Sequence, residues 1–196
     1  MTTSTHMPLV VAITGASGAI YGVELLKALR DLGRPAHLIV SQAGARTLEL
    51  ETGLALAEVQ ALAERSHAED DLAAPVSSGS FATAGMVVLP CSIKTLSAVA
   101  HSFNHNLIAR AADVCLKERR RLVLAVRETP LHQGHLEMMA RVAGLGAVIL
   151  PPLPAFYHHP ATVLDIVRQS VGKVLDQFAI DHQLYARWQG PPEAGR

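Results

Sequence analysis

The sequence predicts an α/β fold: a single doubly wound domain with a mostly parallel sheet and helices on both faces, of the Rossmann or flavodoxin-like type. Three observations predict it. Short apolar runs recur along the chain, helical patterns separate these runs, and a glycine-rich turn follows the first run. Runs rich in Val, Ile and Leu are typical of parallel strands that helices cover on both sides. Strands that alternate with helices indicate a doubly wound sheet.

Five of the apolar runs are expected to form buried strands, and six other segments have helical patterns. The expected strands span residues 9–14, 36–41, 86–90, 122–127 and 147–150. The expected helices span residues 19–32, 43–51, 56–65, 107–118, 134–143 and 161–179. In the first helix, Val23, Leu26 and Leu29 lie on one apolar stripe, and Gly33 is well placed to end the helix.

Two segments interrupt this alternation. Residues 75–83 are rich in Ser and Gly, and we expect them to form an active-site loop. Residues 151–160 contain too many prolines for regular structure. They follow the last expected strand, at the edge where open sheets bind ligands. Pro160 is expected to begin the long C-terminal helix.

Composition limits the classes of function. The 196 residues suffice for one domain, expected over 9–190, with a leader at 1–8 and a tail at 191–196. With 49% hydrophobic and 17% charged residues, the chain is apolar enough to predict buried subunit interfaces. Basic and acidic residues balance at 17 each, which gives no support for nucleic acid or a membrane surface as a partner. Two cysteines fit a reducing cytoplasm, and no apolar run approaches the roughly 18 residues of a membrane span.

The glycine-rich turn over residues 14–22 predicts an anion site. A strand, a tight turn and a helix start direct backbone N–H groups and the positive end of a helix toward one point. Gly15 and Gly18 remove side chains that would block close approach. We therefore expect a nucleotide phosphate at this helix start. The turn alone leaves open which nucleotide binds.

Two nucleotide classes fit the turn poorly. Its glycine spacing differs from the TGxxxGxG turn of short-chain dehydrogenases, and no Tyr is followed four positions later by Lys. The second strand ends in Ser41, where an NAD site needs an acidic residue for the ribose. The turn also lacks the GxxxxGK[ST] pattern of a nucleoside-triphosphate loop.

The third expected strand runs into a second polar turn, residues 91–97, which contains three hydroxyl side chains. Hydroxyls and backbone N–H groups after a strand suit a phosphate or the edge of an isoalloxazine ring. An ordinary helix with Ser92 as its N-cap explains the same residues. Both interpretations stay open at this level.

Taken together in order, these segments resemble the UbiX/Pad1 family of flavin prenyltransferases. The resemblance covers the chain from Leu9 to about Trp188. The matching segments are residues 14–19, 90–98, 106–114, 117–120, 127–131, 135–136, 146–151 and 156–158. Any one of these motifs is weak, whereas the ordered set is specific.

The resemblance implies an activity, a cofactor and partners. Members of this family join the dimethylallyl group of dimethylallyl monophosphate to N5 and C6 of reduced FMN, and a fourth ring forms. The product, prenylated FMN, is the cofactor of a UbiD-type decarboxylase. Family members are homo-oligomers, typically dodecamers, and need no metal. The sequence agrees with the last point, since it has no DDxxD cluster for magnesium diphosphate.

The resemblance also implies a flavin site. Ser17 is expected near the flavin N5, although a helix N-cap is the alternative role for its hydroxyl. Arg127 ends an apolar strand, where an unpaired guanidinium would be costly, so we expect it to have a ligand or carboxylate partner. The residues expected to bind FMN are Gly15, Ala16, Ser17, Ser41, Ser92, Ile93, Lys94, Thr95 and Arg127.

Acidic and basic residues complete the implied site. Glu128 is expected to help move the proton that C6 loses, a task that the leaving phosphate can also perform. The resemblance implies a catalytic role for Glu51, whereas the residue considered in isolation is better explained as a helix-surface carboxylate. Trp188 is expected to shield the allyl cation. The residues expected to hold the prenyl phosphate are Arg110, Lys117, Tyr157 and Lys173.

Three of these assignments carry qualifications from the residues themselves. Lys117 is also counted among the catalytic groups. For Arg110, a surface salt bridge is the alternative role. Lys173 stands where the family often has Arg. A lysine keeps the positive charge but lacks the bidentate fork of the guanidinium. Some of these groups are expected to reach the site from a neighbouring subunit.

Two other functions are alternatives to prenyl transfer. The first is an FMN-dependent cysteine decarboxylase of the phosphopantothenoylcysteine type. That group has a His in the first-helix region and a PxANxxT motif, from which residues 19–23 and 105–108 depart. The second is a non-catalytic flavin-binding protein. Mere flavin binding does not need the second set of phosphate-binding groups.

Overall fold

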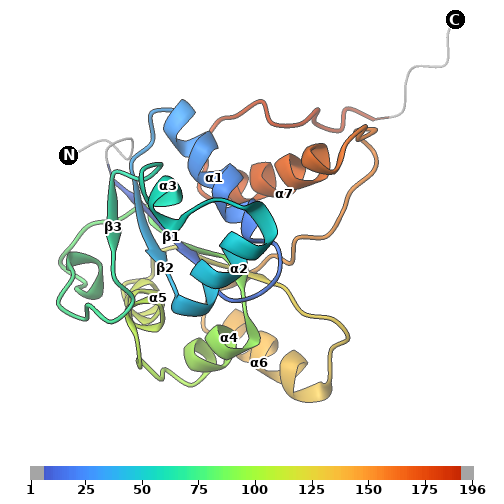
Figure 1. Ribbon diagram of the computed structural model, residues 1–196. Helices are drawn as coiled ribbons and strands as arrows, with labels where there is room; N and C mark the ends of the chain where they lie inside the picture. Colours follow the sequence, from blue (N-terminus) through green and yellow to red (C-terminus); the bar gives the residue numbers. More distant parts are fainter. Residues whose placement is uncertain (1–6, 191–196) are drawn as a thin grey trace, which may run out of the picture.

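A six-stranded, all-parallel sheet with strand order β3-β2-β1-β4-β5-β6 forms the centre of the structure (Figure 1). The computed structural model describes residues 7–190, so the predicted tail and most of the predicted leader lie outside the described residues. The strands are β1 (Leu9–Ile13), β2 (Ala36–Val40), β3 (Arg65–His67), β4 (Gly85–Cys91), β5 (Leu122–Val126) and β6 (Val148–Ile149). The doubly wound α/β fold is confirmed, with all five predicted strands in place.

Helices cover both faces of the sheet. They are α1 (Ala19–Asp31), α2 (Gln42–Thr52), α3 (Leu56–Gln60), α4 (Ile93–Ala100), α5 (Leu107–Lys117), α6 (Gln133–Gly144) and α7 (Val163–Gln177). Helix α1 packs against α7 on one face, while α4, α5 and α6 lie on the other. Strand β1 serves both cores: Val11 and Ile13 face the first and Val10 and Ala12 face the second. This alternation is what a fully buried strand requires.

The sixth strand, β3, was not predicted. We expected one helix over residues 56–65, but α3 ends at Gln60 and Arg65 already begins β3. Strand β3 pairs in parallel with β2, and the rings of His67 and His37 are hydrogen bonded at 3.1 Å. Its residues are Arg, Ser and His at the edge of the sheet, so no apolar pattern marks them as a strand.

The start of the last helix also differs from the expectation. Pro160 does not begin it; α7 begins at Val163 with Thr162 as its N-cap. The Asp165 N–H donates to the Thr162 hydroxyl at 3.2 Å, and the Thr162 N–H donates to the Asp165 carboxylate at 2.8 Å. This capping box satisfies the exposed donors of the first turn better than a proline would. Residues 151–160 lack regular structure, as predicted.

The topology creates two functionally different edges of the sheet. The carboxyl edge holds the segments that follow β1, β2, β4 and β5, which are neighbours in the strand order. The order reverses between β1 and β4, and such switch points are where open α/β sheets bind ligands. The amino edge holds the segments that precede the strands. No helix within residues 7–190 is long and apolar enough to cross a membrane.

Candidate active site

The turn after β1 places Ser17 at the carboxyl edge, exposed and just before α1. Gly18, not Ser17, is the N-cap of α1, so the cap residue offers no side chain to the first turn of the helix. Gly18 has a φ of +103°, a conformation that favours glycine. The alternative N-cap role for Ser17 is therefore wrong, and its hydroxyl faces Glu51 instead.

Glu51 occupies the helix start at which we expected a phosphate. Its carboxylate accepts hydrogen bonds from the N–H of Gly18 at 2.8 Å and of Ala19 at 3.0 Å. Burial raises the pKa of Glu51, but hydrogen bonds from Ser17, Gly18 and Ala19 outweigh burial and hold this pKa below its usual value. The anion at the positive end of α1 is thus a side chain of the protein itself, which corrects the expectation.

Thr14 ties the first polar turn to the second. Its buried hydroxyl donates to the carbonyl of Pro90 at 2.7 Å and accepts from the N–H of Ser92 at 2.9 Å. The two turns therefore hold a fixed separation at the switch point. The sequence interpretation gave Thr14 no role, although a polar residue that ends a buried strand is a signal that could have found it.

Two further helices begin at the same edge with hydroxyl caps. The Ser92 hydroxyl accepts from the Thr95 N–H at 3.4 Å, which confirms the predicted N-cap of α4. The Ser41 hydroxyl accepts from the Gly44 N–H at 3.0 Å and caps α2. Ile93 and Thr95 are partly buried and Lys94 is exposed. The edge thus combines hydroxyls with the positive ends of α2 and α4.

Arg127 lies at the carboxyl edge but not as expected. Its side chain is exposed, so the argument that burial demands a partner is wrong. The Arg127 N–H donates to the carbonyl of Cys91 at 3.0 Å, which fixes its backbone beside the second turn. Burial raises the pKa of Tyr21, and the charge of Arg127 opposes this shift. The guanidinium therefore lies near both Tyr21, which we had not singled out, and Glu51.

Glu128, Gly15 and Ala16 complete this group. Glu128 is exposed, and its carboxylate accepts from the Thr129 N–H at 3.0 Å. Ala16 is buried and Gly15 is exposed. A Cβ at Gly15 would lie 2.5 Å from the Ala43 Cβ, so only glycine lets this turn approach α2 so closely.

A second group of predicted residues lies around the C-terminal segment. The rings of Tyr157 and Trp188 meet edge to face at 6.1 Å, and Lys173 on α7 forms an ion pair with Asp176 at 3.4 Å. Phe178, just after α7, lies beside Gly85 at the start of β4. The C-terminal half of α7 therefore points toward the amino edge, away from Ser17.

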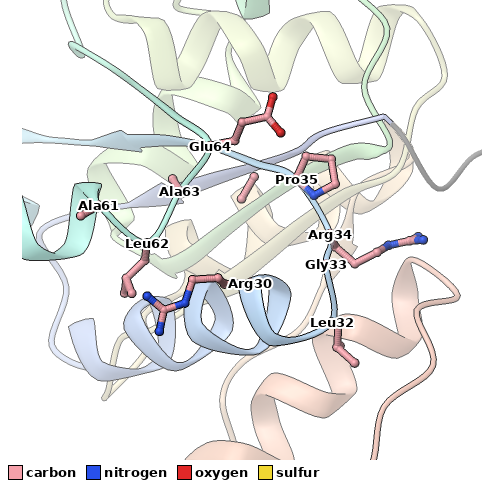
Figure 2. A pocket seen from close by; sticks show the side chains of 10 residues that line it. Arg30, Leu32, Gly33, Arg34, Pro35, Ala61, Leu62, Ala63 and Glu64 are labelled. Carbon is pink, nitrogen blue, oxygen red and sulfur yellow. The ribbon is translucent and has the colours of Figure 1, made fainter.

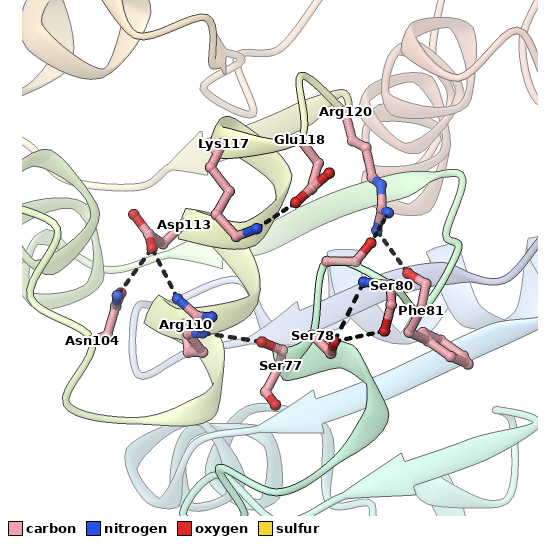
Figure 3. Close-up of polar contacts among 11 residues, drawn as sticks. Ser77, Ser78, Ser80, Phe81, Asn104, Arg110, Asp113, Lys117, Glu118 and Arg120 are labelled. Atoms are coloured by element: carbon pink, nitrogen blue, oxygen red, sulfur yellow. Dashed lines mark hydrogen bonds and ion pairs between the residues drawn. The ribbon is translucent and has the colours of Figure 1, made fainter.

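A third group lies on α5 (Figure 3). Arg110 donates to the carbonyl of Ser77 at 3.0 Å and to the Asp113 carboxylate at 3.3 Å. The salt bridge that we kept as its alternative role is thus present. Lys117 ends α5 and is paired with Glu118 beside Gly79. Since Leu122 then begins β5, Lys117 also lies at the amino edge.

These contacts change the role of the Ser- and Gly-rich segment 75–83. Arg120 donates to the carbonyls of Gly79 at 2.5 Å and Phe81 at 2.7 Å, and Arg110 holds Ser77 (Figure 3). The segment precedes β4 and is therefore at the amino edge. Within one protomer it does not border the group around Ser17.

A hollow of about 620 Å³ also lies at the amino edge (Figure 2). It is lined by the end of α1, the start of β2 and the turn after α3, and its charged side chains are Arg30, Arg34 and Glu64. None of the predicted site residues borders it. Within residues 7–190, no three His, Cys, Asp or Glu side chains gather in a way that could hold a metal ion.

Comparison with known proteins identifies the family. A family model described as Flavoprotein matches residues 1–175. The chain is 60% identical over 185 residues to flavin prenyltransferase UbiX of Escherichia coli K12, covering 93% of this chain and 98% of the relative. It belongs to the UbiX family of flavin prenyltransferases. UbiX of Thauera aromatica is 55% identical over 187 residues, 95% of this chain and 96% of the relative.

Solved structures support this membership. A crystal structure of AnUbiX in complex with FMN and dimethylallyl pyrophosphate has a TM-score of 0.94 and 49% identity, covering 95% of this chain and all of that one. A dodecameric FMN-dependent UbiX-like decarboxylase from E. coli O157:H7 has a TM-score of 0.91 and 50% identity, covering 94% and 100%. A phosphopantothenoylcysteine-type decarboxylase, at 14% identity and a TM-score of 0.60, shares the fold alone.

Proposed function

We propose that this UbiX-family chain joins the dimethylallyl group of dimethylallyl monophosphate to N5 and C6 of reduced FMN, and so makes prenylated FMN. One observation supports this most: Ser17, Glu51, Ser92 and Arg127 come together at the switch point of the sheet. The hydroxyls of Ser17 and Ser92, with a carboxylate and a guanidinium, offer hydrogen-bond donors and acceptors that suit the donors and acceptors along the polar edge of a flavin.

The residues present fit FMN. The caps of α2 and α4 leave N–H and hydroxyl groups at the carboxyl edge, and Arg127 adds an exposed positive charge. Gly15 carries no side chain, because a Cβ there would lie 2.5 Å from the Ala43 Cβ, so its backbone stays open to a ligand. Because Glu51 fills the end of α1, the phosphate of FMN is expected nearer Ser41 and Arg127 than α1. Gly15, Ala16, Ile93, Lys94 and Thr95 are proposed to complete the binding surface.

When bound, reduced FMN would supply two nucleophilic positions: the bond from N5 to the allyl carbon would replace that carbon's bond to phosphate, with loss of the N5 proton, and the bond from C6 would form as the allyl double bond takes up a proton and C6 loses one. The chain supplies charge and proton control. Glu51 holds the Ser17 hydroxyl where it can orient toward the flavin edge, and Glu128 takes the proton from C6. Arg110, Lys117, Tyr157 and Lys173 neutralise the leaving phosphate, and the Trp188 ring stabilises the allyl cation.

These groups need more than one protomer. Ser17 and Glu51 lie at the carboxyl edge, whereas Lys117 and Lys173 lie toward the amino edge of the same chain. We therefore propose a homo-oligomer, a dodecamer as in the UbiX-like relative from E. coli O157:H7, in which copies bring the groups together. Leu153, Phe156 and Val163 are 71%, 66% and 78% exposed beside Tyr157 and would be covered by such a contact.

The proposal extends to the fate of the product. Prenylated FMN made here would serve a UbiD-type decarboxylase in the cytoplasm.

Both cysteines are free and buried, and burial raises the pKa of the Cys91 and Cys115 thiols to about 12. They therefore stay protonated and take no part in the chemistry.

The test is a product analysis without oxygen. The protein is incubated with reduced FMN and dimethylallyl monophosphate, and the flavin is then released and weighed by mass spectrometry. A flavin that has gained one dimethylallyl unit is the expected product. An unchanged flavin, with folded protein that binds FMN, would refute the proposal. Dimethylallyl diphosphate in a parallel reaction measures the preference for the leaving group.

A further inference from the structure

We propose that Asp176 is a positioning residue: it holds the C-terminal segment 182–188 on α7 and thereby sets Lys173 and Trp188 for the prenyl phosphate. Asp176 is not among the residues proposed to bind FMN, and its side chain is 18% exposed. Its two carboxylate oxygens nevertheless accept three hydrogen bonds and form an ion pair, with partners on both sides of it in the sequence. This inference rests on the proposed function, because it concerns how the prenyl-phosphate groups are held.

The contacts divide between the two oxygens. Oδ1 accepts from Arg187 at 2.7 Å and from Nε2 of His182 at 3.2 Å. Oδ2 accepts from the Tyr185 hydroxyl at 2.8 Å and lies 3.4 Å from the Lys173 ammonium. The three hydrogen-bond donors come from the C-terminal segment, and the ammonium of the ion pair comes from α7 itself. A single carboxylate thus joins the predicted phosphate-binding lysine to the segment that ends at Trp188.

The partners are themselves fixed. The His182 side chain is 1% exposed, and its Nδ1 accepts from the Leu184 N–H at 3.2 Å, so its other ring nitrogen carries the hydrogen directed at Asp176. A Cβ at Gly172 would lie 2.5 Å from the Tyr185 ring and 2.6 Å from the His182 ring. The absence of a side chain at Gly172 lets the segment lie directly on α7.

From this anchor the segment reaches the loop that carries Tyr157. The Arg187 guanidinium lies 5.7 Å from the centre of the Tyr185 ring, and the next residue is Trp188. Trp188 meets Tyr157 at 6.1 Å, and the His158 ring lies 6.4 Å from Tyr185. Burial raises the pKa of Tyr185 to about 12, and its hydrogen bond to Asp176 adds to this shift, so the phenol stays a donor. Loss of the carboxylate would release the whole chain of contacts.

The decisive variant is Asp176→Asn, studied in the full-length protein. An amide of the same shape has one accepting oxygen and no charge, so it cannot keep all three hydrogen bonds and the ion pair, and the segment is expected to detach. Trp188 is the only tryptophan in the sequence, and its fluorescence reports the segment directly. Trp188 is 62% exposed within one protomer, so we expect its detachment to appear as lower fluorescence anisotropy in the variant, together with loss of the emission change that dimethylallyl monophosphate produces in the wild type.

Kinetics separate positioning from general damage. The KM for dimethylallyl monophosphate is expected to rise roughly tenfold, as for loss of hydrogen bonds to a charged group, while the affinity for FMN stays unchanged. Asp181→Asn is the matched control: it removes the same charge from an exposed side chain near Arg187 that makes no hydrogen bond within residues 7–190. It should leave both readouts at their wild-type values.

The outcomes are distinct. If Asp176→Asn keeps the wild-type KM and the wild-type anisotropy of Trp188, Asp176 has no positioning role. A fall in FMN affinity together with the rise in KM would mark general structural damage and equally overturn the inference. If this variant does not fold, Tyr185→Phe and Arg187→Gln, which each remove one donor, decide by the same two readouts. Failure of the wild type to alkylate FMN would instead refute the proposed function.

Discussion

At the scale of single residues, Glu51 shows how a catalytic candidate can also be structural. Its carboxylate closes the start of α1 through two backbone N–H groups and faces Ser17 and Arg127. A helix start usually attracts an external anion, but here the chain provides its own. The same contacts keep Glu51 ionised beside the expected flavin, where an oriented charge is useful for catalysis.

Glu51→Gln tests this double role. The amide keeps one acceptor but loses the charge, so prenyl transfer is expected to slow about a hundredfold, in the range of general acid–base effects. Because the folded-state pKa lies below the ordinary 4.5, the charge stabilises the fold above that pH, and this contribution is lost as the pH falls further. The free energy of unfolding, measured with urea, should therefore fall more between neutral and acid pH in the wild type than in the variant.

The neighbouring carboxylate supplies the control. Glu49 is exposed on the same helix and accepts no side-chain hydrogen bond within the described chain. Glu49→Gln should keep the wild-type rate and pH dependence. Equal rates for Glu51→Gln and the wild type would remove Glu51 from the site.

Sequence patterns singled out candidate residues without showing how these residues meet. Ser17 and Glu51 were both singled out, but their contact joins positions more than thirty residues apart, and no local pattern encodes it. Thr14 and Asp176 were missed because their roles depend on partners that only the fold brings close. Arg127 was expected to be buried, since its position at a strand end does not reveal that the edge is open.

At the scale of elements, apolar runs predicted the central strands well because burial on both faces requires Val, Ile and Leu. The edge strand β3 has no such requirement, and its polar residues pair with β2 only because β2 is already placed. The start of α7 has a different cause: the capping box of Thr162 and Asp165 is itself a local signal, and it overrides the nearby proline. Apolar patterns thus fail where tertiary pairing decides, as at β3.

The contact between α1 and the sheet gives a prediction at this scale. A Cβ at Gly22 would lie 2.7 Å from the Ile13 side chain and 2.7 Å from the carbonyl of Leu89. Gly22→Ala should therefore lower the free energy of unfolding by about 1–3 kcal/mol, as overpacking does. Urea denaturation followed by circular dichroism measures it.

Gly144 is a matched control for this substitution. It lies in α6, and nothing occupies the space within 4 Å of its potential Cβ. Gly144→Ala is expected to be neutral or slightly stabilising, by up to about 1 kcal/mol, because Ala favours the helix. A Gly22→Ala protein as stable as Gly144→Ala would contradict the packing argument.

At the scale of the whole molecule, the predicted site residues fall on opposite edges of one sheet. The residues proposed to bind FMN lie at the carboxyl edge, whereas Lys117 lies at the amino edge and Lys173 lies in the half of α7 that points toward it. The apolar composition already indicated buried interfaces, and the exposed Leu153, Phe156 and Val163 show one place for them. The sequence could not reveal this division, because the order of the motifs along the chain does not say which of them lie at the carboxyl edge of the sheet and which lie at the amino edge. The central claim is therefore a site shared between copies.

Co-assembly of two inactive variants tests this claim most directly. Arg127→Gln impairs the residues proposed to bind FMN, and Lys173→Gln impairs the residues proposed to bind the prenyl phosphate. The homo-oligomer of either variant should therefore convert little FMN. Co-expressed with different tags and purified as mixed oligomers, they should recover about one quarter of the wild-type yield of prenylated FMN, because a shared site combines edges at random. Mixed oligomers no more active than the separate variants, beside an active wild type, would contradict the account.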